Sequence, residues 1–319
     1  MKITVIGCGR WGSFIAYYLS DVAGHDVTLY GRKSSRSMGE FISSRKNKYL
    51  TLPEKIRLTT ELSEALDTDT VVISVNSQGL RSLFSEINAV SDVPRRYILC
   101  MKGIEIDTGC RLSEIVGECA KEGSRVAVWL GPGHVEEFLR GTPNCMVIDS
   151  DDGDLKSELV EEFSSQLIRF YYGTDLLGNE IGAASKNVIG IAAGMLDGHG
   201  LTALKGALMA RGTREISRLI GKMGGDPNSA YGLCHLGDYE ATVFSKFSHN
   251  RAFGEAWVNG EEYGELAEGY YTVRALTQLG CKYGEELPIC SAVEDILYKH
   301  RDSSECLSAL FARSLKSEF

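Results

Sequence analysis

The start of the chain places a short apolar run directly before a glycine motif, which limits the folds open to it. Residues 3–6 read as a buried strand, residues 7–12 match G-x-G-x-x-G, and residues 11–19 have the apolar spacing of a helix. In such a unit the first glycine permits a tight turn, the second lets a pyrophosphate approach the backbone, and the third allows close packing. The motif predicts dinucleotide binding at Gly7, Gly9 and Gly12; an ordinary glycine turn is the alternative.

Strand-like and helical patterns alternate through the first half of the chain. Further strand-like runs lie at 27–30, 71–75, 97–101, 126–130 and 168–172. Helical segments such as 80–87 and 112–120 separate them. Short, continuously apolar runs are typical of strands buried on both faces of a parallel sheet. We therefore predict an α/β, doubly wound Rossmann-type domain over residues 1–175.

The pattern changes near residue 175, after which no convincing alternating segment is found. Helical patterns lie at 180–196, 204–223, 261–279 and 291–297. We predict an all-α C-terminal domain over residues 176–319, with a solvated helix end at 313–317.

Composition limits the class of partner. The 319 residues are 43% hydrophobic and 24% charged, as in a globular protein with a well-formed core, and the net charge is −9. An acidic chain is a poor candidate for binding nucleic acid or anionic lipid. An anionic metabolite would need a local positive pocket.

Cysteine usage and hydropathy limit the compartment. The nine cysteines include no C-x-x-C pair, which disfavours a disulfide framework and a zinc ribbon, so we expect reduced thiols and no metal. The longest apolar stretch, 188–196, is shorter than the roughly 20 residues of a membrane helix. With no basic-then-apolar leader before the first strand, we expect a soluble, cytoplasmic protein.

The end of the second strand bears on which dinucleotide is bound. An acidic residue there would bind the ribose hydroxyls of NAD. Residues 29–35 contain no carboxylate, and Arg32 and Lys33 with Ser34 and Ser35 could hold a 2′-phosphate. A solvated basic loop is the alternative. The loop favours NADP over NAD.

One lysine lies inside an apolar helical segment. Residues 181–195 are small and apolar apart from Ser185, Lys186 and Asn187. A buried ammonium is costly without a polar or anionic partner, and burial favours the neutral amine, which suits proton transfer. A lysine that reaches the surface from one helix face is the alternative, but this helix is apolar nearly all round. We predict that Lys186 is the catalytic acid or base.

Five further segments stand out along the chain, at 101–105, 131–137, 184–198, 236–251 and 267–269. In these segments the chain resembles NAD(P)-dependent sn-glycerol-3-phosphate dehydrogenases of the bacterial type, over essentially its full length. The central segment resembles that family's signature around the lysine and asparagine at Lys186 and Asn187. Several motifs in the same order and at matching separations are more specific than any one of them.

The resemblance implies reversible reduction of dihydroxyacetone phosphate to sn-glycerol 3-phosphate, with Lys186 protonating the developing alkoxide. It implies a role in phospholipid synthesis and a homodimer. The implied substrate-binding residues are Lys102, Gly131, Gly133, Asn187, Asp238, Thr242, Ser248, His249 and Asn250. The implied cofactor-binding residues are Gly7, Gly9, Arg10, Trp11, Gly12, Arg32, Lys102, Val135, His249 and Glu268.

Four departures from the family pattern lie in its substrate segments. His249 stands where the family has a phosphate-binding arginine, Gly133 where it has serine or threonine, and Leu130 where serine is usual. Residues 199–205 lack the expected asparagine and are one residue shorter. A neutral histidine offers a phosphate one donor where arginine offers a fork. Either Arg251 or Lys246 compensates, or the substrate differs.

Two other functions are therefore kept open. The chain could act on another small phosphorylated hydroxy or keto compound with the same cofactor chemistry. It could also be a non-catalytic NADPH-sensing regulator, although Lys186, Lys102, Asp238 and Thr242 together argue against that function, because a sensor needs no proton donor.

Overall fold

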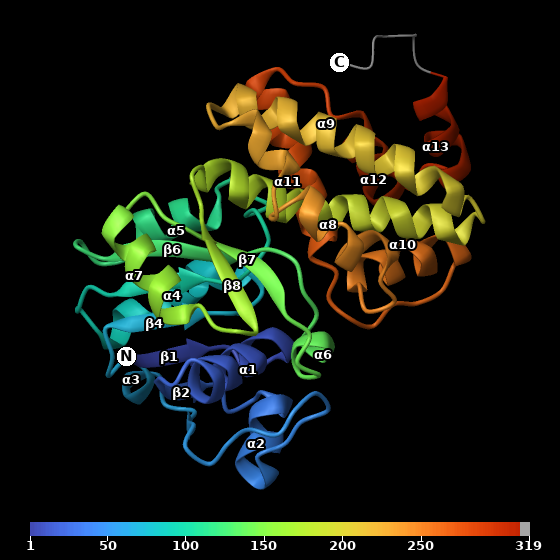
Figure 1. Ribbon diagram of the computed structural model, residues 1–319. Helices are drawn as coiled ribbons and strands as arrows, with labels where there is room; N and C mark the ends of the chain where they lie inside the picture. The colour runs from blue at the N-terminus through green and yellow to red at the C-terminus, as the bar shows by residue number, and fades with distance from the viewer. Residues whose placement is uncertain (313–319) are drawn as a thin grey trace. The chain divides into compact units, whose positions relative to one another are not determined.

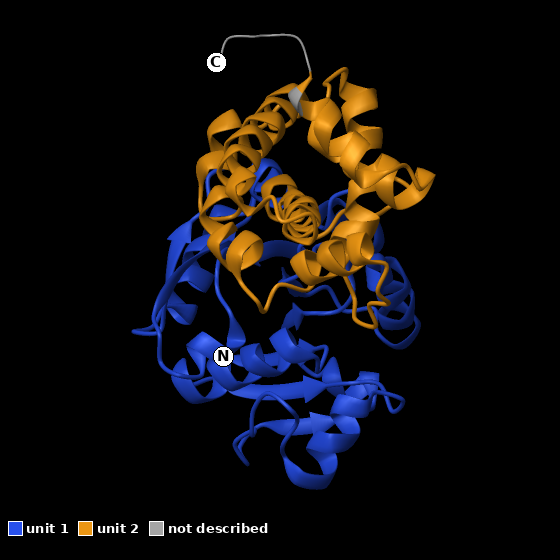
Figure 2. Cartoon of the chain, turned by 90° about the vertical axis from the view of Figure 1, so that its right-hand side faces the viewer, with its two compact units in different colours: residues 1–102, 110–180 blue, residues 103–109, 181–319 orange. Residues whose placement is uncertain are grey.

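The computed structural model describes residues 1–312, so the predicted helix end at 313–317 lies outside the described residues. The chain divides into two compact units (Figure 2). Unit 1 comprises Met1–Lys102 and Cys110–Glu180, and unit 2 comprises Gly103–Gly109 and the chain from Ile181 onward. The domain limits predicted above, 1–175 and 176–319, remain predictions.

Unit 1 is built on an eight-stranded sheet in the order β3-β2-β1-β4-β5-β6-β7-β8. Figure 1 labels β1, β2, β4, β6, β7 and β8 of this sheet. The strands are β1 Lys2–Ile6, β2 Asp26–Tyr30, β3 Arg57–Thr59, β4 Thr70–Ile73, β5 Arg96–Leu99, β6 Arg125–Leu130, β7 Asn144–Asp149 and β8 Ile168–Tyr172. The doubly wound order around β1 and β4 confirms the predicted fold class. The sheet is parallel, as expected, except at one pair that was not predicted, because β7 pairs antiparallel with β6.

Helices of unit 1 connect the strands. They are α1 Arg10–Tyr17, α2 Arg36–Ser44, α3 Leu62–Ala65, α4 Leu80–Val90, α5 Leu112–Cys119, α6 Val135–Phe138 and α7 Gly153–Phe163. The side chains of Ser35 and Asp152 cap α2 and α7, because each accepts a hydrogen bond from the backbone N–H of the third residue of its helix.

An aromatic group joins α1, the sheet and α7 on one face. Trp129 of β6 is fully buried and meets Phe170 edge-on, with ring centroids 4.9 Å apart. Tyr18, which follows α1, lies edge-on to the same indole at 5.7 Å and donates a hydrogen bond to the carbonyl of Phe163. Burial of several large rings contributes a sizeable share of this unit's hydrophobic stabilisation.

Unit 2 is helical. Its helices are α8 Leu176–Gly198 (which begins in unit 1), α9 Lys205–Met223, α10 His249–Asn259, α11 Glu268–Tyr283, α12 Pro288–Lys299 and α13 Ser303–Phe311. Short turns at Leu236–Asp238 and Glu240–Phe244 precede α10. This confirms the all-α class of the C-terminal part. Within residues 1–312, no helix has the length and apolar character needed to cross a bilayer.

The helix prediction at 261–279 is wrong at its start, because Ala267 has an extended backbone and α11 begins only at Glu268. Sequence patterns also missed α10 and α13. Gly254 lies in the middle of α10 and weakens its helical pattern. A Cβ there would lie 2.1 Å from the carbonyl oxygen of Ile191, so α10 crosses α8 with almost no space between the backbones.

A buried carboxylate joins α9 to the start of α12. Glu215 accepts hydrogen bonds from the backbone N–H groups of Ile289, at 2.9 Å, and Cys290, at 3.0 Å. These are orphan donors of the first turn of α12. Burial nevertheless raises the pKa of Glu215 to about 7, against the opposing effect of the two hydrogen bonds.

The Glu215 carboxyl should make stability depend on pH. Its folded-state pKa lies above the unfolded value, so its contribution is present below about pH 4.5 and is lost as the pH rises through about 7. The loss is on the order of 3 kcal/mol. Glu215→Gln has no carboxyl group to titrate. The free energy of unfolding in urea, measured for the variant and for wild type at pH 5 and pH 8, should therefore fall more for wild type than for the variant as the pH rises. Glu122→Gln, at an exposed position, is the control. A difference in unfolding free energy between Glu215→Gln and wild type that does not change with pH would contradict this assignment.

Candidate active site

The three motif glycines have different structural requirements. Gly7 has a φ of +112°, and a Cβ there would lie 2.0 Å from the carbonyl oxygen of Ser74. A Cβ at Gly12 would lie 2.0 Å from the carbonyl oxygen of Gly7. Gly9 has a φ of −71°, and across residues 1–312 a Cβ there would meet no atom within 4 Å beyond its chain neighbours. Packing therefore explains Gly7 and Gly12, whereas open space at Gly9 fits the close approach of a ligand.

Arg10 and Trp11 connect the start of α1 to the short helix α6. The Arg10 guanidinium forms an ion pair with Glu136 at 2.5 Å. The Trp11 ring lies 5.4 Å from Phe14 and 6.1 Å from Phe138, centroid to centroid. Trp11 thus packs against aromatic residues of unit 1, and the expectation that it packs on the cofactor stays a prediction.

The loop after β6 explains the departure at position 133. Gly133 has a φ of +142°, and a Cβ there would lie 2.3 Å from the ring of Phe138. That ring stacks on Phe14 with centroids 5.1 Å apart. A serine or threonine at position 133 would therefore need both a strained backbone and a displaced ring. The next residues lead to Val135, a buried residue that begins α6.

Lys102 and Gly131 are brought together at the ends of β5 and β6. The Lys102 ammonium donates a hydrogen bond to the carbonyl oxygen of Gly131 at 2.7 Å. The contact orders the lysine side chain beside the loop that carries Gly133.

The basic pair after β2 is exposed and paired with carboxylates. Arg32 lies 2.5 Å from Glu86 and Lys33 lies 2.6 Å from Glu61. The Ser35 hydroxyl accepts a hydrogen bond from Met38 N and contacts the Cys8 thiol at 3.1 Å. Ion pairs this exposed are weakened by solvent screening, so a phosphate could compete for the two cations.

Lys186 is held in a buried polar cluster of unit 2. Its Nζ lies 2.8 Å from Asp238 Oδ2 and donates to Thr242 Oγ1, also at 2.8 Å. The Thr242 hydroxyl in turn donates to the carbonyl oxygen of Asp238 at 2.8 Å. The Lys186 side chain is only 10% exposed. The ion pair keeps a charged ammonium in place despite its burial, and the predicted residues Lys186, Asp238 and Thr242 do lie together.

Asn187 and Asn250 form a second link around α8. The Asn250 amide donates to Asn187 Oδ1 at 3.0 Å, and Asn250 Oδ1 accepts from the backbone N–H of Gly269 at 2.9 Å. A Cβ at Gly269 would lie 2.7 Å from the carbonyl oxygen of Asn187. These contacts hold the first turns of α10 and α11 next to Asn187.

The remaining predicted residues of unit 2 lie at helix starts. Ser248 caps α10 by accepting a hydrogen bond from Arg251 N, and His249 is the first residue of that helix. His249 Nδ1 lies 2.6 Å from the Tyr263 hydroxyl. Glu268 is the first residue of α11.

The two cations considered as substitutes for the missing arginine differ in their surroundings. Arg251 forms ion pairs with Asp197 and Glu255, both at 2.8 Å. Lys205, in the segment that departs from the family pattern, also contacts Asp197, at 2.6 Å. Arg251 is therefore already paired with two carboxylates of unit 2, whereas Lys246 is exposed.

Two residues that the sequence analysis did not single out, His235 and Tyr239, adjoin this cluster. His235 Nδ1 lies 2.8 Å from the carbonyl oxygen of Gly182, and its Nε2 lies 2.7 Å from the Tyr239 hydroxyl. Because a carbonyl only accepts, Nδ1 carries the proton and the tyrosine donates to Nε2. Burial, with a smaller contribution from the charge of Lys186, lowers the pKa of His235 to about 4. Nothing in the local sequence pairs His235 with Gly182, so spacing could not reveal it.

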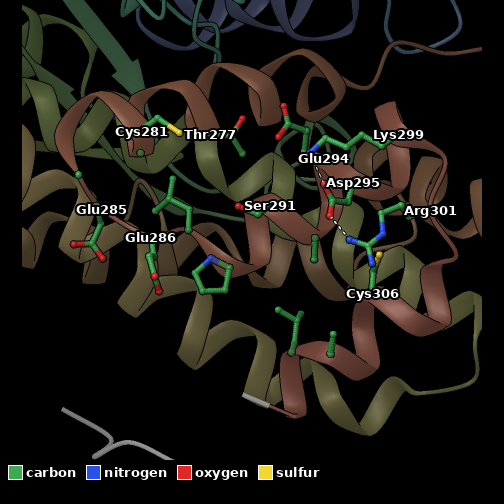
Figure 3. Close-up of a pocket in the computed structure, with 17 residues that line it drawn as sticks. Thr277, Cys281, Glu285, Glu286, Ser291, Glu294, Asp295, Lys299, Arg301 and Cys306 are labelled. Carbon is green, nitrogen blue, oxygen red and sulfur yellow. Dashed lines mark hydrogen bonds and ion pairs between the residues drawn. The ribbon is translucent and has the colours of Figure 1, made fainter. Parts of the chain in front are cut away.

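A hollow elsewhere in unit 2 has no part in this arrangement. It has a volume of about 680 Å³ and lies among α11, α12 and α13 (Figure 3). Glu285, Glu294 and Asp295 are among its lining residues, and Asp295 is paired with Arg301. None of the predicted site residues lines it.

Each unit thus brings some of the predicted residues together. Unit 1 has a glycine loop suited to an anionic ligand and, in the loop after β5, Lys102. Unit 2 supplies a buried, anchored ammonium with amides beside it. An anchored ammonium can donate a proton and stabilise negative charge that develops on an oxygen.

Comparison with known proteins matches both parts of the chain. Residues 2–156 match the family described as NAD-dependent glycerol-3-phosphate dehydrogenase N-terminus, and residues 175–308 match its C-terminus. A glycerol-3-phosphate dehydrogenase [NAD(P)+] of Exiguobacterium sp. is 37% identical, over 99% of this chain and 97% of the relative. One from Corynebacterium diphtheriae is 36% identical over the full length of both chains.

A solved structure agrees. The crystal structure of glycerol-3-phosphate dehydrogenase from Coxiella burnetii has a TM-score of 0.91 and 26% identity, over 98% of this chain and 99% of that chain. The chain therefore belongs to the NAD-dependent glycerol-3-phosphate dehydrogenase family.

Proposed function

We propose that the protein catalyses the NAD(P)-dependent, reversible reduction of dihydroxyacetone phosphate to sn-glycerol 3-phosphate. The observation that carries the proposal is the buried Lys186 ammonium, held by Asp238 and Thr242 at 2.8 Å each in a chain of this family. The product is a precursor of phospholipids, which is the metabolic role we assign.

Lys186 is the proton donor of the reduction and the acceptor in reverse. Its ammonium stabilises the negative charge that grows on the carbonyl oxygen and then transfers a proton to that oxygen. Asp238 keeps the lysine charged before transfer, and Thr242 fixes the direction of Nζ. A bound nicotinamide supplies the hydride. Orientation of the carbonyl is the other contribution of the protein.

The glycine loop fits a dinucleotide, because Gly9 leaves open space at the start of α1. We assign cofactor binding to Gly7, Gly9, Arg10, Trp11, Gly12, Arg32, Lys102, Val135, His249 and Glu268. Arg32 and Lys33 favour NADP, since a 2′-phosphate gains two cations after β2, whereas no carboxylate lies in 29–35 to receive the ribose of NAD.

Substrate binding is assigned to the polar residues around Lys186 and to the Lys102 loop. These residues are Lys102, Gly131, Gly133, Asn187, Asp238, Thr242, Ser248, His249 and Asn250. A different small phosphorylated hydroxy or keto compound is the second candidate substrate. It is favoured by His249 and by the Phe138 ring, which leaves no room for a hydroxyl-bearing side chain at Gly133. A purely sensing role does not account for an anchored ammonium at Lys186.

Location and assembly are proposed on family membership alone. We assign the protein to the cytoplasm as a homodimer that binds neither nucleic acid nor membrane. Light scattering coupled to gel filtration measures the mass directly, and a mass near 35 kDa would reject the dimer.

Lys186→Ala should lower kcat for dihydroxyacetone phosphate by about 10²- to 10⁴-fold, the usual contribution of a positioned general acid. NADPH oxidation followed by absorbance measures the rate, and NADPH fluorescence checks that cofactor binding is retained. Lys222→Ala, near the end of α9, is the surface control. An unchanged kcat for Lys186→Ala would reject Lys186 as the proton donor.

Gly9→Ala and Gly12→Ala should separate ligand binding from folding. A methyl at Gly9 meets open space, so the variant should keep the wild-type Tm but lose at least about tenfold in NADPH affinity. A methyl at Gly12 lies 2.0 Å from a carbonyl oxygen, so that variant should unfold at lower temperature. Calorimetry and fluorescence titration give the two readouts; undiminished NADPH affinity in Gly9→Ala would show that the loop does not approach the dinucleotide.

Arg32→Ala should raise the KM for NADPH about three- to tenfold and leave the KM for NADH within about twofold, as expected for one charge-assisted contact to a 2′-phosphate. Arg36→Ala, at a highly exposed neighbouring position, should change neither constant. Equal increases in the KM values for NADPH and NADH would mean that Arg32 does not contact the 2′-phosphate.

A further inference from the structure

Tyr263 turns inward from an otherwise exposed segment. Its neighbours at 261, 262 and 264–266 are exposed, whereas Tyr263 is half-buried. Its hydroxyl lies 2.6 Å from His249 Nδ1, and the two ring planes are inclined at 63°. The segment thus directs one hydroxyl to the residue that replaces the family's arginine.

Packing fixes the Tyr263 ring independently of that hydrogen bond. The ring lies edge-on to Phe253 of α10, with centroids 5.9 Å apart. Phe253 also contacts Trp257 and lies edge-on to Tyr270. The aromatic neighbours therefore hold the ring of Tyr263, and its hydroxyl forms the hydrogen bond with His249.

The contact selects one form of the imidazole. A neutral histidine carries its proton on either Nδ1 or Nε2. A phenol is the stronger donor, and burial together with nearby Glu265 raises the pKa of Tyr263, so the phenol stays protonated. Donation from Tyr263 to Nδ1 then places the imidazole proton on Nε2.

We propose that Tyr263 is a positioning residue that orients His249 and holds it in the Nε2–H tautomer, so that the imidazole donates a hydrogen bond to a phosphate oxygen of a bound ligand. The proposal rests on the proposed function, in which His249 contacts substrate and cofactor. The phosphate belongs either to the small substrate or to the dinucleotide, and both offer the same acceptor chemistry.

Tyr263→Phe keeps the ring and removes only the hydroxyl. We expect the KM of the ligand that His249 contacts to rise about three- to tenfold, the effect of one neutral hydrogen bond, with kcat within about twofold. Separate titrations of dihydroxyacetone phosphate and NADPH identify the source of the phosphate. Unchanged KM values for both ligands, or a fall in kcat alone, would overturn the proposal.

A double-mutant cycle tests whether Tyr263 acts through His249. In the His249→Ala background, Tyr263→Phe should have no further effect on either KM. An equal effect in both backgrounds would overturn the positioning role. Tyr298→Phe is the matched control, because it also removes a tyrosine hydroxyl bond in unit 2, to the carbonyl of Tyr270, and should leave both KM values unchanged.

The tautomer can be measured without turnover. In ¹⁵N NMR spectra of the full chain, the His249 signals are those missing in His249→Ala. We expect a protonated Nε2 in the wild type and a mixture of tautomers in Tyr263→Phe. A protonated Nδ1 in the wild type would overturn the inference even if the enzyme is active, whereas the expected tautomer in a protein that does not reduce dihydroxyacetone phosphate would fault only the proposed function.

Discussion

The buried contact between Lys186 and Asp238 is the interaction on which the rest of unit 2 depends. An ammonium that is 10% exposed in an apolar helix is tolerated only with an anionic partner, and Asp238, 1% exposed, needs the cation equally. Removal of one partner from such a pair costs about 3–5 kcal/mol. The pair therefore ties the turn before α10 to α8 and places the reactive ammonium at a fixed point.

Glycines in unit 2 make that arrangement possible. Gly190 leaves room for the Thr242 side chain, and Gly194 lies where a Cβ would be 1.9 Å from the carbonyl oxygen of Arg251. Larger residues on this face of α8 would push away the segments that carry Thr242 and Asn250. The small residues that make α8 look merely apolar in sequence thus bring polar partners close to Lys186 and Asn187.

The sequence predicted the fold class because buried parallel strands and the glycine loop have strong local patterns. It missed β7, although residues 145–148 are apolar, and the antiparallel pairing of β7 with β6 has no local signature. Of the site, only Lys186 and its need for a polar or anionic partner could be anticipated from the cost of a buried lysine; Asp238 and Thr242 were expected from the family resemblance. The contacts of Tyr263 with His249 and of His235 with Gly182 depend on tertiary structure, so no spacing rule could indicate them.

Chemical rescue tests the central claim, that the Lys186 ammonium donates the proton, most directly. A small primary amine such as methylamine, added to Lys186→Ala, fills the place of the missing group without altering the rest of the cluster. The account predicts that turnover of dihydroxyacetone phosphate rises with amine concentration, saturates, and follows the basicity of the amine used. Absence of any rescue, in a variant that still binds substrate and NADPH, would contradict it.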